Sequence, residues 1–144
     1  MYELQNLMKN KIFIIFGFLL FILDQLIKQT LVGKPSFLNW DFVCNKGVAF
    51  GVEINFLFIF LSNILIIFLI IIFLIKKNQS FIYKNQIFFI IILLGAFSNL
   101  IDRALWGCVI DYIDFKIWPV FNLADVLISG SALLIVIKTF LKKT

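Results

Sequence analysis

Long apolar runs that alternate with polar connections dominate the pattern of this chain. The runs cover residues 12–27, 56–75, 87–101 and 120–137. The second run is interrupted only by Ser62 and Asn63, and at about 1.5 Å per residue it spans roughly 30 Å, the thickness of a bilayer core. Because backbone groups in lipid must be paired within their own segment, we predict four membrane-spanning helices, at about 12–28, 56–75, 86–104 and 119–138.

The composition indicates a single membrane-embedded domain covering residues 1–144. Hydrophobic residues make up 62% of the chain, and the mean hydropathy is +1.07. A soluble domain is usually only about 45–50% apolar. The predicted fold class is therefore an all-α membrane protein, built as a four-transmembrane-helix bundle.

The first apolar run has one other interpretation, a cleaved signal peptide, because Lys9 and Lys11 precede it. A small-x-small cleavage site is missing, and Asp24 and Lys28 disrupt the usual pattern. We therefore expect this run to be a retained helix.

Basic residues predict the orientation of the helices. They gather before the first run, between the second and third, and after the fourth, where Glu3 is the one acidic residue. The remaining acidic residues lie in or beside the other two connections. The positive-inside rule then places both termini in the cytoplasm and the polar connections outside. We interpret the net charge of +5 as this topology signal, so nucleic acid is not expected as a partner.

The two outer connections are expected to lie at the membrane surface. Residues 29–55 mix apolar and polar residues in short alternations, which predicts a small extracytoplasmic β-strand platform between the first two helices. Residues 105–119 are similar, and Trp106 and Trp118 are suited to the membrane interface. Pro119 is well placed to open the last helix.

Two short motifs near this surface have a structural and a functional interpretation. Asp24 and Lys28 are four residues apart, so on a helix they share a face. They form either an ordinary ion pair or a device that orients a pocket. Asn45 begins the sequence Asn-Lys-Gly-Val-Ala-Phe-Gly, which is either a plain turn or a backbone platform for an extended ligand.

The stretch from Gly95 to Arg103 predicts a polar face at the end of the third helix. Gly95, Ala96 and Ser98 are small enough to let helices approach closely. Asn99, Asp102 and Arg103 fall on one face, and Arg103 can pair with Asp102 or hold another carboxylate. We expect this set to support a site without carrying its chemistry.

Asp111 and Asp125 are the candidates for chemistry. Asn122 and Asp125 lie three residues apart at the start of the last helix, where a carboxylate also favours the helix dipole. Apolar residues surround Asp125, and Asp111 on the preceding connection could fold back to meet it. Two aspartates in one site share a proton, so that one acts as general acid while the other activates water.

Other mechanisms find less support in the residues. The chain has no histidine, which removes Ser-His-Asp, Cys-His and His-Glu-x-x-His arrangements, and no metal or other cofactor is expected. A Ser–Lys dyad stays formally open, with Ser36 as nucleophile and Lys28, Lys34 or Lys46 as base. Cys44 and Cys108 form no disulfide framework or Cys-x-x-Cys motif, and we interpret both as incidental.

Five motifs in order resemble those of the bacterial lipoprotein signal peptidases (signal peptidase II), four-helix membrane aspartyl proteases. They are DQLIK at 24–28, NKGVAF at 45–50, GAFSNLIDR at 95–103, GCVIDYI at 107–113 and FNLAD at 121–125. Two departures are small: Ser98 stands where the family usually has Gly, and Tyr112 where Phe is common.

The resemblance implies the roles of individual residues. Asp111 and Asp125 would be the catalytic pair. The supporting and substrate-binding residues would be Asp24, Lys28, Asn45, Gly95, Asn99, Asp102, Arg103, Asn122 and Ala124. The implied substrate is a diacylglyceryl-modified prolipoprotein, cut before its lipidated cysteine by a monomeric enzyme that contacts membrane lipid. The implied location is the bacterial cytoplasmic (inner) membrane, with the site facing outward.

Two other classes of function remain as alternatives. A small proton-coupled transporter would place polar residues near the middle of its helices. A non-enzymatic membrane scaffold would use the same polar clusters to hold helices together.

Overall fold

The computed structural model describes residues 2–33, 41–47, 55–75 and 80–141. The elements, in chain order, are α1 (Tyr2–Gly33), β1 (Val43–Asn45), α2 (Phe56–Ile75), α3 (Ser80–Trp106), β2 (Val109–Asp111) and α4 (Leu123–Phe140).

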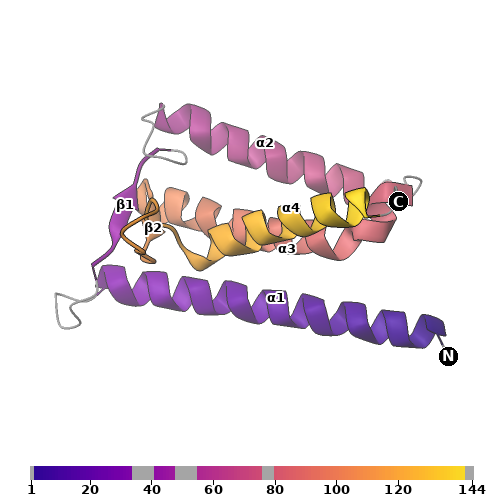
Figure 1. Cartoon of the computed structure of the whole chain (residues 1–144). Helices are drawn as coiled ribbons and strands as arrows, with labels where there is room; N and C mark the ends of the chain where they lie inside the picture. The colour runs from indigo at the N-terminus through magenta and orange to yellow at the C-terminus, as the bar shows by residue number, and fades with distance from the viewer. Residues whose placement is uncertain (1, 34–40, 48–54, 76–79, 142–144) are drawn as a thin grey trace.

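The helices form a bundle with α3 at its centre. α3 packs against α4, α1 and α2, and α1 also contacts α4 (Figure 1). The start of α1 and the end of α4 lie at one end of the bundle, whereas both strands lie at the other end (Figure 1). The start of α1 and the end of α4 thus share one end of the bundle, and the strands occupy the other.

All four helices contain a segment long and apolar enough to cross a membrane. The segments are Lys11–Gly33, Phe56–Ile75, Lys84–Trp106 and Leu123–Phe140. The expected bundle of four transmembrane helices is thus confirmed, and the chain is a multi-pass membrane protein.

The small sheet joins two connections that are far apart in the sequence. β1 pairs with β2 in antiparallel fashion, with Val43 opposite Asp111, Cys44 opposite Ile110 and Asn45 opposite Val109. β1 lies in the predicted strand segment between the first two helices, and its partner comes from the connection between α3 and α4. Residues 34–40 and 48–54 of the predicted platform lie outside the described residues. The sheet places Asp111 at the end of the bundle opposite the start of α1 and the end of α4.

Three helices differ from their expected ranges at one end or both. α1 begins at Tyr2 and continues to Gly33, and α3 begins at Ser80. α4 begins at Leu123, so Pro119 does not open it. The reason is that Phe121 forms an antiparallel bridge with Ile113, and Asn122 caps the helix with extended backbone (φ −130°, ψ 175°).

The bundle is apolar outside and partly polar inside. Large side chains such as Phe16, Leu65 and Phe68 are more than half exposed, as expected for a surface that faces lipid. The buried polar and charged residues are Asp24, Gln25, Lys28, Asn85, Ser98, Asn99, Asp102, Asp111, Asn122 and Ser131. Most of them gather where the strands meet the helices, and charges in such a place mark a functional site.

The prediction that Cys44 and Cys108 are incidental is wrong. The two cysteines form a disulfide across the sheet, with their Cα atoms 5.4 Å apart and a sequence separation of 64. The pairing depends on the register of β1 against β2, which spacing along the chain does not reveal.

Candidate functional site

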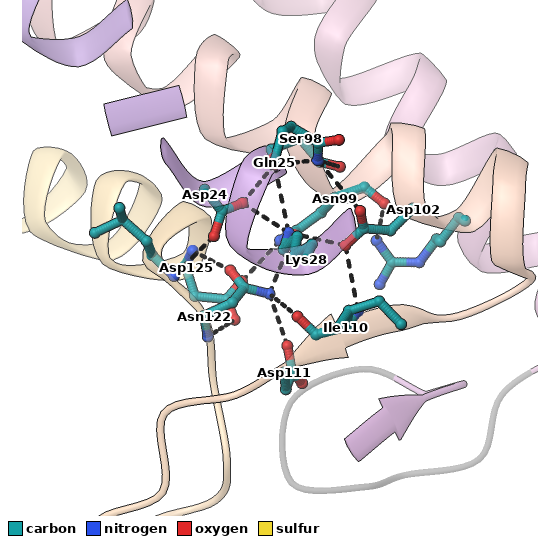
Figure 2. Close-up of polar contacts among 12 residues, drawn as sticks. Asp24, Gln25, Lys28, Ser98, Asn99, Asp102, Ile110, Asp111, Asn122 and Asp125 are labelled. Carbon is teal, nitrogen blue, oxygen red and sulfur yellow. Dashed lines mark hydrogen bonds and ion pairs between the residues drawn. The ribbon is translucent and has the colours of Figure 1, made fainter. Parts of the chain in front are cut away.

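A buried ionic cluster ties α1 to α3. Lys28 lies 2.8 Å from a carboxylate oxygen of Asp24 and 2.8 Å from one of Asp102 (Figure 2). Lys28 and Asp24 are 0% exposed, and Asp102 is 1% exposed. The Asp24–Lys28 pair expected from the sequence is present, but Asp102 pairs with Lys28 and not with Arg103.

Three neutral side chains that the sequence analysis left out of the site complete this cluster. The Ser98 hydroxyl donates to Asp24 Oδ2 at 2.5 Å, and Gln25 donates to Asp102 at 3.2 Å. The Tyr112 hydroxyl donates to Asp24 Oδ1 at 2.7 Å, and burial is the largest cause that raises the Tyr112 pKa. Ser98 and Tyr112 are also the two positions at which the sequence departs from the family motifs. These departures were the sequence signal that could have pointed to both residues.

Asn99 connects the ionic cluster to Asp125. Its side-chain oxygen accepts hydrogen bonds from Lys28 at 3.0 Å and from Asn122 at 3.1 Å. These two donors fix the orientation of the amide, so its nitrogen faces Asp125 Oδ1 at 2.7 Å (Figure 2).

Asn122 holds both candidate carboxylates. Its side-chain nitrogen donates to Asp111 Oδ1 at 2.6 Å, while its side-chain oxygen accepts the backbone N–H of Asp125 at 2.9 Å. The backbone N–H of Asn122 donates in turn to Asp125 Oδ2 at 3.3 Å, which completes a capping box at the start of α4. The helix cap and the two aspartates therefore form one connected unit.

Asp111 receives a second amide from β1. Asn45 donates to Asp111 Oδ2 at 2.9 Å, and the Asn45 side-chain oxygen accepts the backbone N–H of Gly47. Burial raises the pKa of Asp111 from 3.8 to about 6, although the hydrogen bond from Asn45 lowers it, and the nearby charge of Asp125 raises it further. Asp111 is therefore a carboxyl group that holds its proton more strongly than an exposed one.

Both aspartates line one cavity of about 900 Å³. Its polar wall includes Asn45, Asn99 and Arg103 along with Asp111 and Asp125. Its apolar wall is formed mainly by the connection between β2 and α4, through Phe115, Ile117, Trp118, Pro119, Val120 and Phe121. The cavity therefore presents a polar, charged wall and an apolar wall to a single ligand.

Arg103 reaches the cavity without a carboxylate partner in the described part of the chain. The only oxygen within hydrogen-bonding reach there is the Asn99 carbonyl of its own helix, at 3.5 Å. Asp102, the partner considered from the sequence, is occupied by Lys28 and by the backbone N–H of Ile110. The guanidinium is therefore placed to meet a ligand.

Gly95 and Ala124 set the spacing of α3 and α4 beneath the site. A Cβ atom on Gly95 would lie 2.6 Å from the Ala124 carbonyl oxygen and 2.8 Å from Ile128 Cγ1. Ala124 is fully buried. This close approach brings Asn99 of α3 within reach of Asp125 of α4.

The described residues offer no ready metal site. No group of three or more His, Cys, Asp or Glu side chains within the described ranges is arranged to hold a metal ion. The chemistry available from these residues is that of two carboxyl groups, an arginine and several amides around one cavity.

The chain resembles known proteins over nearly its whole length. The profile of a family described as Signal peptidase (SPase) II matches residues 16–141. The lipoprotein signal peptidase of Halothermothrix orenii is 36% identical, with 79% of this chain and 86% of that protein aligned. The enzyme of the same name from Caldicellulosiruptor bescii is 42% identical, with 80% and 81% aligned.

Two solved structures of bacterial membrane enzymes are similar to this chain. A bacterial membrane enzyme determined by the in meso method at 2.3 Å resolution superposes with a TM-score of 0.74 at 29% identity, covering 94% of this chain and 90% of that one. A second, at 1.9 Å resolution, gives a TM-score of 0.69 at the same identity and covers 94% of both chains. The sequence match, the helical bundle and the polar site at one end lead to the same conclusion: the chain belongs to the signal peptidase II family.

Proposed function

We propose that Asp111 and Asp125 are the catalytic pair of an aspartyl endopeptidase. As a member of the signal peptidase II family, the chain is a peptidase that processes lipoprotein signal peptides. The observation that carries the aspartyl mechanism is the placement of both carboxylates in one cavity, where the Asn122 side chain donates to Asp111 and the Asn122 backbone N–H donates to Asp125. Two carboxyl groups so placed are suited to share a single proton.

Asp111 is the member of the pair that keeps the proton. It is 2% exposed, whereas Asp125 is only half-buried. Burial and the charge of Asp125 both raise the pKa of Asp111. The protonated Asp111 then acts as the acid and the charged Asp125 as the base.

Hydrolysis then follows without a covalent intermediate. Asp125 removes a proton from a water molecule, and the water oxygen attacks the peptide carbonyl while Asp111 donates a hydrogen bond to the carbonyl oxygen. When the carbon–nitrogen bond breaks, the proton taken by Asp125 passes to the leaving amine. Asn99 and Asn122 keep the two carboxylates in place throughout.

The substrate is a prolipoprotein whose cysteine carries a diacylglyceryl group, and the cut falls before that cysteine. The apolar wall that includes Phe115, Ile117 and Trp118 suits acyl chains next to the polar catalytic side. The extended peptide would pair along β1, which among the described residues has a strand neighbour on one edge only. Arg103 would hold a carbonyl oxygen of this peptide.

The remaining proposed residues hold the catalytic pair and its neighbours in position. Asp24, Lys28 and Asp102 anchor Asn99 through the buried ionic cluster, and Gly95 with Ala124 sets the helix spacing. The enzyme would act as a monomer in the bacterial cytoplasmic membrane, with both termini inside and the strand end outside.

Two alternatives have less support. Ser36, the nucleophile considered for a Ser–Lys dyad, lies outside the described residues. Lys28, one of its possible bases, is fully buried and paired with two carboxylates, so it is not available as a base. A transporter would need polar groups along the helices, whereas the ionic cluster lies at the strand end, where Asp102 binds the backbone of Ile110 in β2, and α2 carries no charged residue.

The test is cleavage of a purified diacylglyceryl prolipoprotein by the wild type and by Asp111→Asn and Asp125→Asn variants. Each variant is expected to fold and to lose at least about a thousandfold in kcat, as removal of a catalytic group usually does. Asp114→Asn is the matched control, because Asp114 is exposed on the same connection and pairs with Lys116. Full cleavage by Asp111→Asn would show that the assignment is wrong.

A further inference from the structure

The Cys44–Cys108 disulfide joins the two strands that bring Asn45 to Asp111. Cys44 immediately precedes Asn45, and Cys108 lies just before the strand that ends in Asp111. The hydrogen bond between Asn45 and Asp111 therefore lies one residue from the crosslink on one strand and three on the other.

The two strands differ in how firmly the rest of the protein holds them. All three residues of β2 are buried, and Ile110 of β2 donates its N–H to Asp102 in the ionic cluster. β1 is a three-residue strand in which Val43 and Cys44 are exposed and Asn45 is half-buried. An isolated pair of short strands is only marginally stable, so β1 depends on the crosslink to stay on β2.

We propose that Cys44 and Cys108 are positioning residues whose disulfide holds Asn45 against Asp111 and thereby sets the rate of peptide cleavage. This inference rests on the proposed role of Asp111. A dithiol reductant would supply two electrons and two protons, break the sulfur–sulfur bond to give two thiols, and itself become a cyclic disulfide. Cys44 is exposed, so the reductant can reach the bond.

The position of the disulfide agrees with the predicted orientation of the chain. Disulfides form and persist in oxidising compartments and are rare in the cytosol. The strands lie at the end of the bundle opposite the first residues of α1 and the last residues of α4 (Figure 1). The charge pattern independently assigns that end to the outside.

The first experiment compares the full-length oxidised enzyme with the enzyme kept in dithiothreitol, using a diacylglyceryl prolipoprotein as substrate. Reduction is expected to lower kcat/KM by about tenfold, the loss that follows when one hydrogen bond to Asp111 is no longer held. The Cys44→Ala/Cys108→Ala variant should show the same loss and no further response to dithiothreitol. Iodoacetamide should label neither cysteine of the denatured, unreduced wild type, and labelling of both would overturn the proposal.

The second experiment asks whether the disulfide acts through Asn45. In an Asn45→Ala background, breaking the disulfide should cost less than about twofold, because the contact it holds is already gone. An equal loss in both backgrounds would overturn the proposal. The pH midpoint of kcat/KM should also move upward on reduction, since Asn45 donates to the ionised form of Asp111.

The pH midpoint keeps the test decisive if a variant folds poorly, because it does not depend on how much of the sample is folded. A wild type that fails to cleave in its oxidised form would count against the proposed function. A wild type that cleaves with the same rate and pH midpoint before and after reduction would count against the disulfide proposal alone.

Discussion

The side-chain nitrogen of Asn122 lies 2.6 Å from a carboxylate oxygen of Asp111, and the same residue caps the helix that carries Asp125. One amide thus links the strand end of the bundle to the start of α4. The local structure of α4 and the geometry of the site cannot change independently.

Substitutions of Asn122 should separate these two tasks. Asn122→Ala is expected to lower the free energy of unfolding by about 1 kcal/mol through loss of the cap, and to lower kcat by at least about tenfold. Asn122→Ser keeps a capping oxygen but cannot reach Asp111, so it should lose activity with little loss of stability. Thermal unfolding in detergent and cleavage assays would measure both; equal activity of Asn122→Ser and the wild type would contradict the role in catalysis.

The pH dependence should report the proton on Asp111. Its pKa is raised from 3.8 to about 6, so Asp111 loses its proton as the pH rises through that value. Above it both are charged and the acid is lost. We expect kcat/KM to fall as pH rises through a midpoint near 6, measured between about pH 5 and 8. A rate that rises over this range would show that Asp111 must be ionised.

Lys28→Met should be among the more damaging single changes. It leaves the carboxylates of Asp24 and Asp102 buried without their cation, which costs about 3–5 kcal/mol in comparable buried pairs. Lys116→Met is the control, since Lys116 pairs with Asp114 at an exposed site and should leave the unfolding temperature unchanged. A similar unfolding temperature for both variants would contradict a structural role for the buried cluster.

Gly95→Ala should reduce activity by moving α4 away from α3. The added methyl group would lie 2.6 Å from the Ala124 carbonyl oxygen, and the backbone there cannot yield without moving the helix. The bond from Asn99 to Asp125 would lengthen, so cleavage should fall by at least about tenfold. Gly130→Ala on α4 meets no atom within 4 Å and should retain wild-type cleavage.

The sequence predicted the helices because long apolar runs have one stable form in lipid. It also predicted the Asp24–Lys28 ion pair, since helical spacing fixes which residues share a face. It did not predict that Lys28 would pair with Asp102. Nor did it predict that Arg103 would line the cavity without a carboxylate partner among the described residues. Those outcomes depend on how α1 packs against α3, which periodicity within each helix does not contain.

The start of α4 and the disulfide were missed for a related reason. Pro119 fits the first turn of a helix, but the pairing of Phe121 with Ile113 keeps the chain extended until Asn122. Cys44 meets Cys108 only because β1 and β2 are neighbours. Tyr112 was visible as an unusual residue, yet its bond to Asp24 requires β2 to lie beside α1.

The double use of Asp125 limits how this protein can change. In many enzymes, replacing a catalytic group raises the free energy of unfolding, because active sites hold polar groups in unfavourable surroundings. Here the carboxylate proposed for catalysis also accepts the N–H that closes the cap of α4. Replacing Asp125 would therefore remove the activity without raising the free energy of unfolding. A descendant that no longer needed the activity would gain no stability by losing this carboxylate.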